Sequence, residues 1–229
     1  MIRGARAAFI RKARPQAERL ARLNAKGLTL VGFDPALTIC YRDEYKSLIP
    51  NCPDFNVMLP EEWLKQALAS EKFLAKEAKI KNALEAIVRR KTPEQEVSSG
   101  AVNEDVIASC DYTEDFYLFC HCTEQALVPL SVQMWQQILA HFKLRLMPVS
   151  VACCGMAGLF GHMKDNLDET RTVYEQNWQA KIRERDFAQC LITGFSCRSQ
   201  VHRMEHKRAN HPIHVLANLL EQAEQESKR

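Results

Sequence analysis

The sequence has 229 residues, 46% hydrophobic and 26% charged, which fits one or two globular domains and excludes a disordered chain or a collagen-like fibre. With 31 Lys and Arg against 28 Asp and Glu, the formal net charge is only +3, which does not favour nucleic-acid binding. The longest segment without charged residues, 146–163, contains one proline, three glycines and two cysteines, so we expect no membrane span.

The N-terminal segment is strongly basic. Residues 1–27 hold eight lysines and arginines but a single acid, Glu18. We interpret this segment as an exposed helix that is interrupted or restarted near Pro15. An Arg-rich, acid-poor stretch also describes a mitochondrial transit peptide, although the segment lacks serine.

Apolar and β-branched runs alternate with helical patterns along the rest of the chain. We expect strands at 28–33, 116–120, 144–151 and 190–194, and helices at 61–91, 124–142, 166–186 and 214–226. The first of these helices is long and is expected to break near Ser70. The alternation predicts an α/β fold: a Rossmann-like, mostly parallel sheet with helices on both faces.

A segment rich in turn-forming residues divides the chain. Residues 92–103 contain Pro93, Gly100 and two serines and offer little to bury, so we interpret them as a linker. The expected parts are 1–91, which is helical with one strand and resembles an incomplete first half, and 104–229, which is cysteine-rich.

Nine cysteines are the unusual feature of the composition. The count is odd, two of them are adjacent and no apolar signal core precedes them, so reduced cytosolic thiols fit better than a disulfide framework. We interpret Cys40, Cys110 and Cys190 as small buried hydrophobes, and Cys52 as a loop residue.

The remaining cysteines gather at the ends of predicted strands. Cys120 closes the strand at 116–120 and Cys122 follows it, the pair Cys153 and Cys154 follows 144–151, and Cys197 follows 190–194. Because loops at the carboxyl ends of parallel strands converge, four thiolates are expected at one edge of the sheet, where they would bind an iron–sulfur cluster or zinc.

The glycines near the adjacent cysteines support this interpretation. Gly155 and Gly158, with Gly161, allow the backbone to turn its N–H groups toward sulfur, so we expect the first two to contact the cofactor. Their spacing is not that of a dinucleotide-binding loop, and the sequence contains no P-loop.

Three segments together resemble the cysteine-rich "CCG" domain of heterodisulfide reductase subunits and FAD-linked oxidoreductases. They are Phe-Cys-His-Cys-Thr-Glu at 119–124, Cys-Cys-Gly-Met-Ala-Gly-Leu-Phe-Gly-His at 153–162 and Thr-Gly-Phe-Ser-Cys-Arg-Ser-Gln at 193–200. Residues 32–35 and 41–45 make the resemblance strongest to the C-terminal end of bacterial D-2-hydroxyglutarate dehydrogenase-type flavoproteins. It extends over about 27–220.

The resemblance implies FAD-binding and ferredoxin-like domains that this chain does not contain, in the same polypeptide or in partner subunits. The family's closing Cys-x-x-Cys is absent, because Gln200 stands at its second cysteine. The resemblance therefore implies an iron–sulfur cluster or mononuclear iron on the four cysteines, with zinc and a nitrogen ligand, His121 or His162, as alternatives.

The expected function is that of an iron-binding module in an FAD-dependent 2-hydroxyacid dehydrogenase, cytoplasmic or peripheral to the inner membrane. The metal would carry electrons or bind the substrate. Arg198 is expected to contact the substrate carboxylate and His162 to transfer a proton, and the chain alone is expected to be inactive. The alternatives are a zinc- or iron-binding scaffold subunit and a basic RNA-binding protein.

Overall fold

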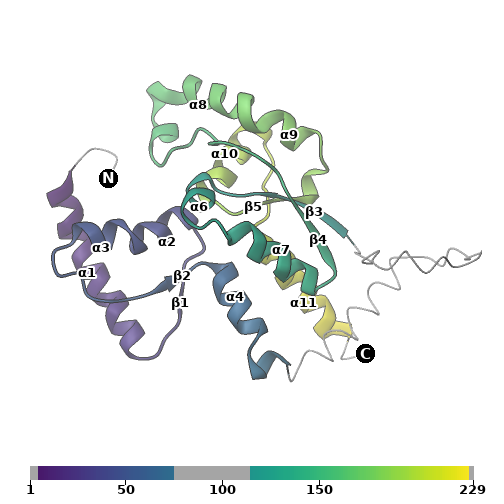
Figure 1. The fold of residues 1–229 in the computed structure, drawn as a ribbon. Coiled ribbons are helices and arrows are strands. Elements are labelled where there is room, and N and C mark those ends of the chain that lie inside the picture. The colour runs from purple at the N-terminus through teal and green to yellow at the C-terminus, as the bar shows by residue number, and fades with distance from the viewer. Residues whose placement is uncertain (1–4, 75–113, 227–229) are drawn as a thin grey trace, which may run out of the picture.

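The structure is a computed structural model that describes residues 5–74 and 114–226 (Figure 1). In the first range the elements are α1 (Arg6–Ala25), β1 (Leu30–Val31), α2 (Pro35–Arg42), α3 (Glu44–Leu48), β2 (Val57–Met58) and α4 (Pro60–Leu68). In the second they are β3 (Glu114–Phe119), α6 (Cys122–Leu127), α7 (Ser131–His141), β4 (Leu144–Pro148), α8 (Leu167–Tyr174), α9 (Ala180–Arg183), β5 (Cys190–Ile192), α10 (Phe195–Glu205) and α11 (Pro212–Glu226).

The strands form two parallel sheets. One has the order β4-β3-β5, with Phe116 opposite Leu146 and Leu118 opposite Leu191. The other pairs β1 with β2. The expected α/β class is therefore confirmed at the level of helices around short parallel sheets. The prediction of a single sheet is wrong, because β1 pairs with a second short strand, β2, that the sequence patterns did not reveal.

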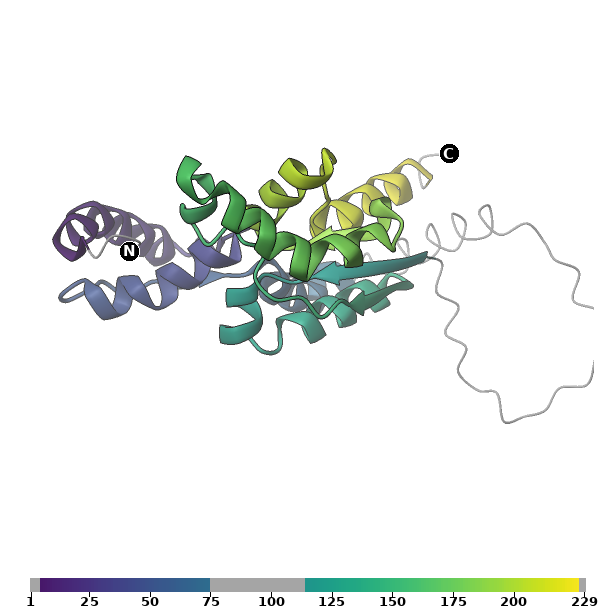
Figure 2. The same cartoon turned by 90° about the horizontal axis from the view of Figure 1, so that it is seen from above.

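Helices cover both faces of the three-stranded sheet. Successive residues of a strand point to opposite faces, and β3 has apolar residues on both, so each face packs against helices. Phe116 and Leu118 contribute to a core with Trp135 of α7 and Leu216 of α11. Phe119 faces a second core on the other side, which includes Tyr174, Trp178, Ile182 and Val201 of the helical segments α8 to α10. Figure 1 shows α8 and α9 on one side of the strands and α7 on the other, and Figure 2 shows the same layers from above.

The N-terminal part has its own small core. Ala13, Ala17 and Leu20 of α1 pack with Tyr45 and Phe55. The expected interruption of this helix at Pro15 is wrong, because α1 runs continuously through the proline. Pro15 is exposed, so the carbonyl that its ring deprives of a hydrogen bond can be solvated by water.

Several boundaries differ from those expected. The helix expected at 124–142 is divided into α6 and α7 at a turn that contains Pro129. The helix expected at 166–186 contains a π-helical turn, Glu175–Gln179, which carries the buried Trp178. The first strand is limited to Leu30–Val31. The helix expected from 61 ends at Leu68, close to the expected break. The linker at 92–103 and Cys110 lie outside the described residues.

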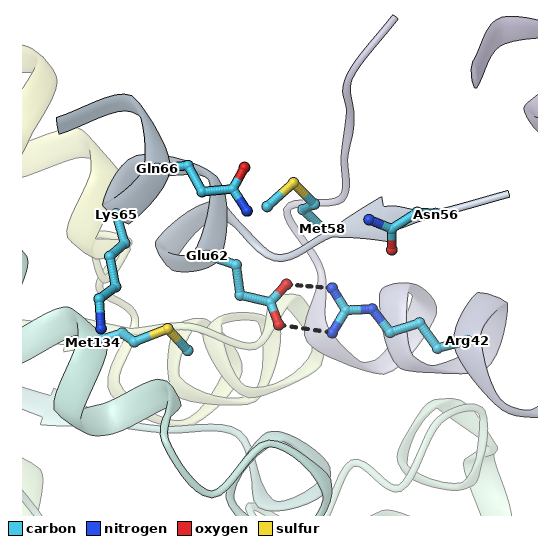
Figure 3. Close-up of a pocket in the computed structure, with 7 residues that line it drawn as sticks. All are labelled: Arg42, Asn56, Met58, Glu62, Lys65, Gln66 and Met134. Carbon is cyan, nitrogen blue, oxygen red and sulfur yellow. Dashed lines mark hydrogen bonds and ion pairs between the residues drawn. The ribbon is translucent and has the colours of Figure 1, made fainter. Parts of the chain in front are cut away.

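An open cavity of about 530 Å³ lies where the N-terminal part meets α7. Arg42 and Glu62 form a two-pronged ion pair in its wall, and Met58 and Met134 supply apolar surface (Figure 3). Arg42 Nε also donates to the carbonyl of Val57, at 2.8 Å. The ion pair between Arg42 and Glu62 therefore fixes the start of α4 against β2.

Within the described ranges, the chain has no helix with both the length and the apolar character needed to cross a membrane.

Candidate functional site

Three loops at the carboxyl ends of the central strands carry the predicted cysteines. Cys122 is the first residue of α6, directly after β3, and Cys197 lies in the first turn of α10, after β5. Cys153 and Cys154 follow β4. Because the three strands are parallel, these loops leave the same edge of the sheet, as the sequence predicted.

The four thiols contact one another in a chain. Cys153 forms hydrogen bonds with Cys122 and with Cys154. Cys154 forms a further hydrogen bond with Cys197, and all four are free thiols. The hydrogen bond from Cys122, followed by those from Cys154 and the backbone of Gly155 and Ala157, lowers the pKa of Cys153. The same contacts raise the pKa of Cys122 and of Cys154, and burial raises both further. The geometry thus favours a thiolate at Cys153, with neighbouring thiols as donors.

The backbone after the cysteine pair has a conformation that requires glycine. Gly155 has a φ of +91°, and its N–H group donates to Cys153 Sγ at 3.3 Å. A Cβ at Gly155 would overlap the carbonyl oxygen of Thr170, whose hydroxyl donates to the Gly155 carbonyl at 2.5 Å. Gly158 also has a positive φ, +66°, but it lies on the exposed part of the turn.

The four thiols have the right chemistry for a metal, and they come from three neighbouring loops. Across residues 5–74 and 114–226, no three His, Cys, Asp or Glu side chains are placed as a group that could hold a metal ion. The predicted metal site is therefore not shown. The donor set still fits an iron–sulfur cluster, iron or zinc, because four sulfur atoms from three loops meet beside backbone N–H groups aimed at Cys153.

His121 is buried beside these thiols as a neutral ring. Its Nδ1 accepts a hydrogen bond from the backbone N–H of Thr123 at 3.1 Å, so the ring proton is on Nε2. Nε2 lies 3.4 Å from Ser196 Oγ and is the donor in that pair. Burial lowers the pKa of His121 and keeps it neutral. In this arrangement the ring has no free lone pair for a metal, so the hydrogen bonding supports a donor role instead.

The two residues expected to contact substrate have different environments. Arg198 is half-buried, and its Nη1 donates to the carbonyls of Ile192 at 2.9 Å and Thr193 at 2.7 Å. Burial lowers the pKa of Arg198, while the nearby carboxylate of Asp34 opposes that shift. His162 is exposed at the end of a short 3-10 helix, Phe160–His162, whereas the four thiols are buried or half-buried.

Three residues that organise the loops were not predicted from the sequence. Glu124 is fully buried and accepts a hydrogen bond from Thr193 Oγ1 at 2.5 Å. Thr193 Oγ1 in turn accepts from the backbone N–H of His121 at 3.0 Å. Asp34 accepts a hydrogen bond from the backbone N–H of Phe195. A signal for Glu124 existed, because an acid two positions after a strand-end cysteine belongs to the quoted motif.

The fold and the loops therefore define an α/β domain with a cluster of four cysteines at one sheet edge. The chain is similar to curated D-2-hydroxyglutarate dehydrogenases: it is 39% identical to the Haemophilus influenzae enzyme and 36% identical to the Escherichia coli enzyme, each over 220 residues. Identity to the Pseudomonas putida enzyme is 34% over 217 residues. This confirms the resemblance that the cysteine motifs indicated.

The alignments cover 94–96% of this chain but only 18–19% of the relatives, so the chain spans about a fifth of their length. The chain is thus homologous to one segment of D-2-hydroxyglutarate dehydrogenases. No protein-family model matches the sequence, and no solved structure matches the chain.

Proposed function

We propose that Cys122, Cys153, Cys154 and Cys197 hold an iron–sulfur cluster or a single iron ion in a part of an enzyme that oxidises a 2-hydroxyacid such as D-2-hydroxyglutarate. The observation that carries the proposal is the contact chain of four thiols from three strand-end loops. When bound, a cluster would carry electrons, and a single iron ion would act as a Lewis acid. Zinc in a purely structural site is the alternative.

The chain's own residues would hold and tune this metal. The N–H of Gly155 stabilises negative charge on Cys153, and metal binding requires the thiolate form. The relatives are about five times longer than the matched segment, so we place the flavin that accepts the hydride, and ferredoxin-like clusters, outside this chain. Those portions are the proposed partners, in the same polypeptide or in separate subunits.

Arg198 and His162 are the proposed contacts to substrate. The two carbonyl hydrogen bonds of Arg198 fix its guanidinium beside the thiol loops, where its charge would attract the substrate carboxylate. His162 is exposed and free to approach a bound hydroxyl. Loss of turnover in Arg198→Ala and His162→Ala, measured with the flavin-bearing partner present, would support these roles. Variants with the same turnover as wild type would contradict them.

Metal analysis after anaerobic reconstitution tests the central proposal. Protein incubated with iron and sulfide should retain both, and the visible absorption of the cluster should disappear in Cys153→Ser and Cys197→Ser. Cys52→Ser is the matched control, because Cys52 lies beside the separate N-terminal core. Retention of zinc alone, unaffected by sulfide, would favour the scaffold. Retention of no metal by protein with reduced thiols would contradict both.

A further inference from the structure

Two buried carboxyl groups share one hydroxyl group beside the loops that carry the thiols. Ser131 Oγ lies 2.6 Å from Glu61 Oε1 and forms a second, shorter hydrogen bond with Glu124 Oε1. Glu61 is 1% exposed, and Glu124 and Ser131 are fully buried. Through Glu124 and Thr193 the chain of hydrogen bonds continues to the backbone N–H of His121. It therefore connects α4, in the N-terminal part, to the loop between Cys120 and Cys122.

Counting protons shows that one of the two carboxyl groups is neutral. The Ser131 hydroxyl has a single proton, but a carboxyl oxygen approaches it from each side. Two ionised carboxylates would leave one of these short contacts without a proton. One carboxyl group must therefore carry a proton and donate it to Ser131 Oγ, while Ser131 donates to the other.

The number of hydrogen-bond donors around each carboxyl group shows which of the two is neutral. Glu124 receives hydrogen bonds from the side chains of Ser131, Thr193 and Cys120. Thr193 must donate to Glu124, because its oxygen already accepts from the His121 N–H. Glu61 has the Ser131 hydroxyl as its side-chain partner. The better-supplied Glu124 is the carboxylate, and Glu61 is the acid.

We propose that Glu61 is a positioning residue of the thiol site: as a neutral acid it donates to Ser131, and through Glu124 and Thr193 it fixes the backbone of His121 between Cys120 and Cys122. Burial raises the pKa of both carboxyl groups, that of Glu61 to about 8, which agrees with one neutral acid in the pair, and the hydrogen-bond donors assign the proton to Glu61. The inference rests on the proposed function only for why this loop matters, since its test needs no metal.

The neighbouring residue holds Glu61 in place. Glu62 forms the ion pair with Arg42 that lines the cavity in Figure 3, and its Oε2 accepts from the backbone N–H of Leu59 at 2.7 Å. These contacts fix the first turn of α4, so that Glu61 points inward while Glu62 points into the cavity. The N-terminal part therefore contributes a buried acid to the site formed by the second part.

The test compares variants of the full, reduced, metal-free chain. Glu61→Gln keeps a donor for Ser131, because its amide N–H replaces the acid O–H, whereas Glu61→Ala removes it. We expect hydrogen exchange of the His121 amide and alkylation of Cys122 to stay within about twofold of wild type in Glu61→Gln. Both should be about tenfold faster in Glu61→Ala, on the scale of one lost buried hydrogen bond.

Infrared spectroscopy at neutral pH gives a direct second readout. The carbonyl band of a protonated carboxylic acid should be present in wild type and absent in Glu61→Gln. This difference remains measurable if Glu61→Ala does not fold, and Ser131→Ala then replaces it in the exchange experiment. Gln66→Ala is the control, because it changes an exposed side chain of the same helix, α4, and leaves the contacts of Glu61 and Glu62 in place.

Three outcomes would overturn the inference. Glu61→Gln matching Glu61→Ala would mean that the native side chain is an ionised acceptor. If the infrared spectrum does not change in Glu61→Gln, Glu61 is not a protonated acid in the wild-type protein. Equal effects of Gln66→Ala and Glu61→Ala on the His121 amide would mean that any change in α4, rather than loss of the hydrogen-bond chain, controls the loop. Failure of metal binding would leave all three readouts unaffected.

Discussion

Asp34 and Phe195 lie 161 positions apart in the sequence, yet Asp34 Oδ1 accepts a hydrogen bond from the backbone N–H of Phe195 at 3.3 Å. The other oxygen of Asp34 accepts from the N–H of Leu37, also at 3.3 Å. One carboxylate thus caps the N-termini of both α2 and α10, where free N–H groups favour negative charge. This contact joins the N-terminal part to the helix that carries Cys197.

Replacing Asp34 should cost more than the loss of an ordinary cap. Asp34→Ala removes hydrogen bonds to two helices, and a single cap is worth about 1 kcal/mol, so we expect a loss of about 1–2 kcal/mol in the free energy of unfolding. Urea denaturation measures it. Asp186→Ala is the control, since Asp186 caps only the short helix Phe187–Gln189 through Ala188. Equal losses in both variants would contradict the bridging role.

The buried acid Glu61 should make stability fall as pH rises. Its pKa is raised to about 8 in the folded chain from an ordinary value of 4.5. Between these values the folded state holds a proton that the unfolded state has lost, so the free energy of unfolding decreases with increasing pH by up to about 1.4 kcal/mol per unit. Glu61→Gln should flatten the slope between pH 5 and 8 in chemical denaturation. An unchanged slope would show that Glu61 ionises normally.

The buried His211 should make the free energy of unfolding decrease as pH falls below 6.5, the opposite of the effect of Glu61. Its side chain is 3% exposed, and Nδ1 accepts from the N–H of Ile213 at 3.2 Å. Burial, then the charges of Arg198 and His214, lowers the pKa of His211 to about 3. The neutral ring therefore stabilises the fold above pH 6.5, and this contribution is lost as pH falls from 6.5 toward 3.

A substitution that cannot titrate isolates the effect of His211. His211→Asn keeps a side-chain acceptor for the N–H of Ile213, so its unfolding free energy should vary less between pH 6.5 and 5 than that of wild type. This window lies above the range in which ordinary carboxyl groups titrate. Parallel curves for the two proteins in this window would contradict a buried neutral histidine.

Two glycines with positive φ separate backbone strain from steric overlap. Gly27 has a φ of +77° and open space around the position of a Cβ, whereas a Cβ at Gly155 would overlap the Thr170 carbonyl. Gly27→Ala should therefore cost only the left-handed strain, about 1–2 kcal/mol. Gly155→Ala should cost clearly more, measured as the loss of unfolding free energy in urea. Similar losses would mean that the loop after Cys154 relaxes freely.

Much of the site followed from the sequence because it depends on local order. Apolar runs mark β3, β4 and β5, and each cysteine lies in the loop or first helical turn after its strand, so parallel pairing brings Cys122, Cys154 and Cys197 to the same edge of the sheet. The hydrogen bonds between thiols depend on rotamers and loop paths, which no spacing rule specifies. The position of Asp34 depends on how β1 and β2 are placed beside the larger sheet.

Elements supported mainly by tertiary contacts were harder to predict. The strand β2 has two residues, Val57 and Met58, and is too short to produce a periodic pattern. Continuous helix through Pro15 depends on the burial of Ala13 and Ala17 against the next helices. The burial of Glu61 could not be predicted either, because charged side chains are ordinarily exposed and its partner Ser131 lies 70 positions away.

The outer edge of the sheet has a consequence for assembly. Val149 donates to the Leu118 carbonyl, so Pro148, the next residue back, turns its nitrogen away from β3 and toward the free side of β4. That nitrogen carries no hydrogen, and the outward carbonyl of Leu146 is already occupied by Gln136 Nε2 at 3.1 Å. A strand from another molecule would find no N–H at Pro148 and no free carbonyl at Leu146. This protects the edge strand β4 against pairing between molecules.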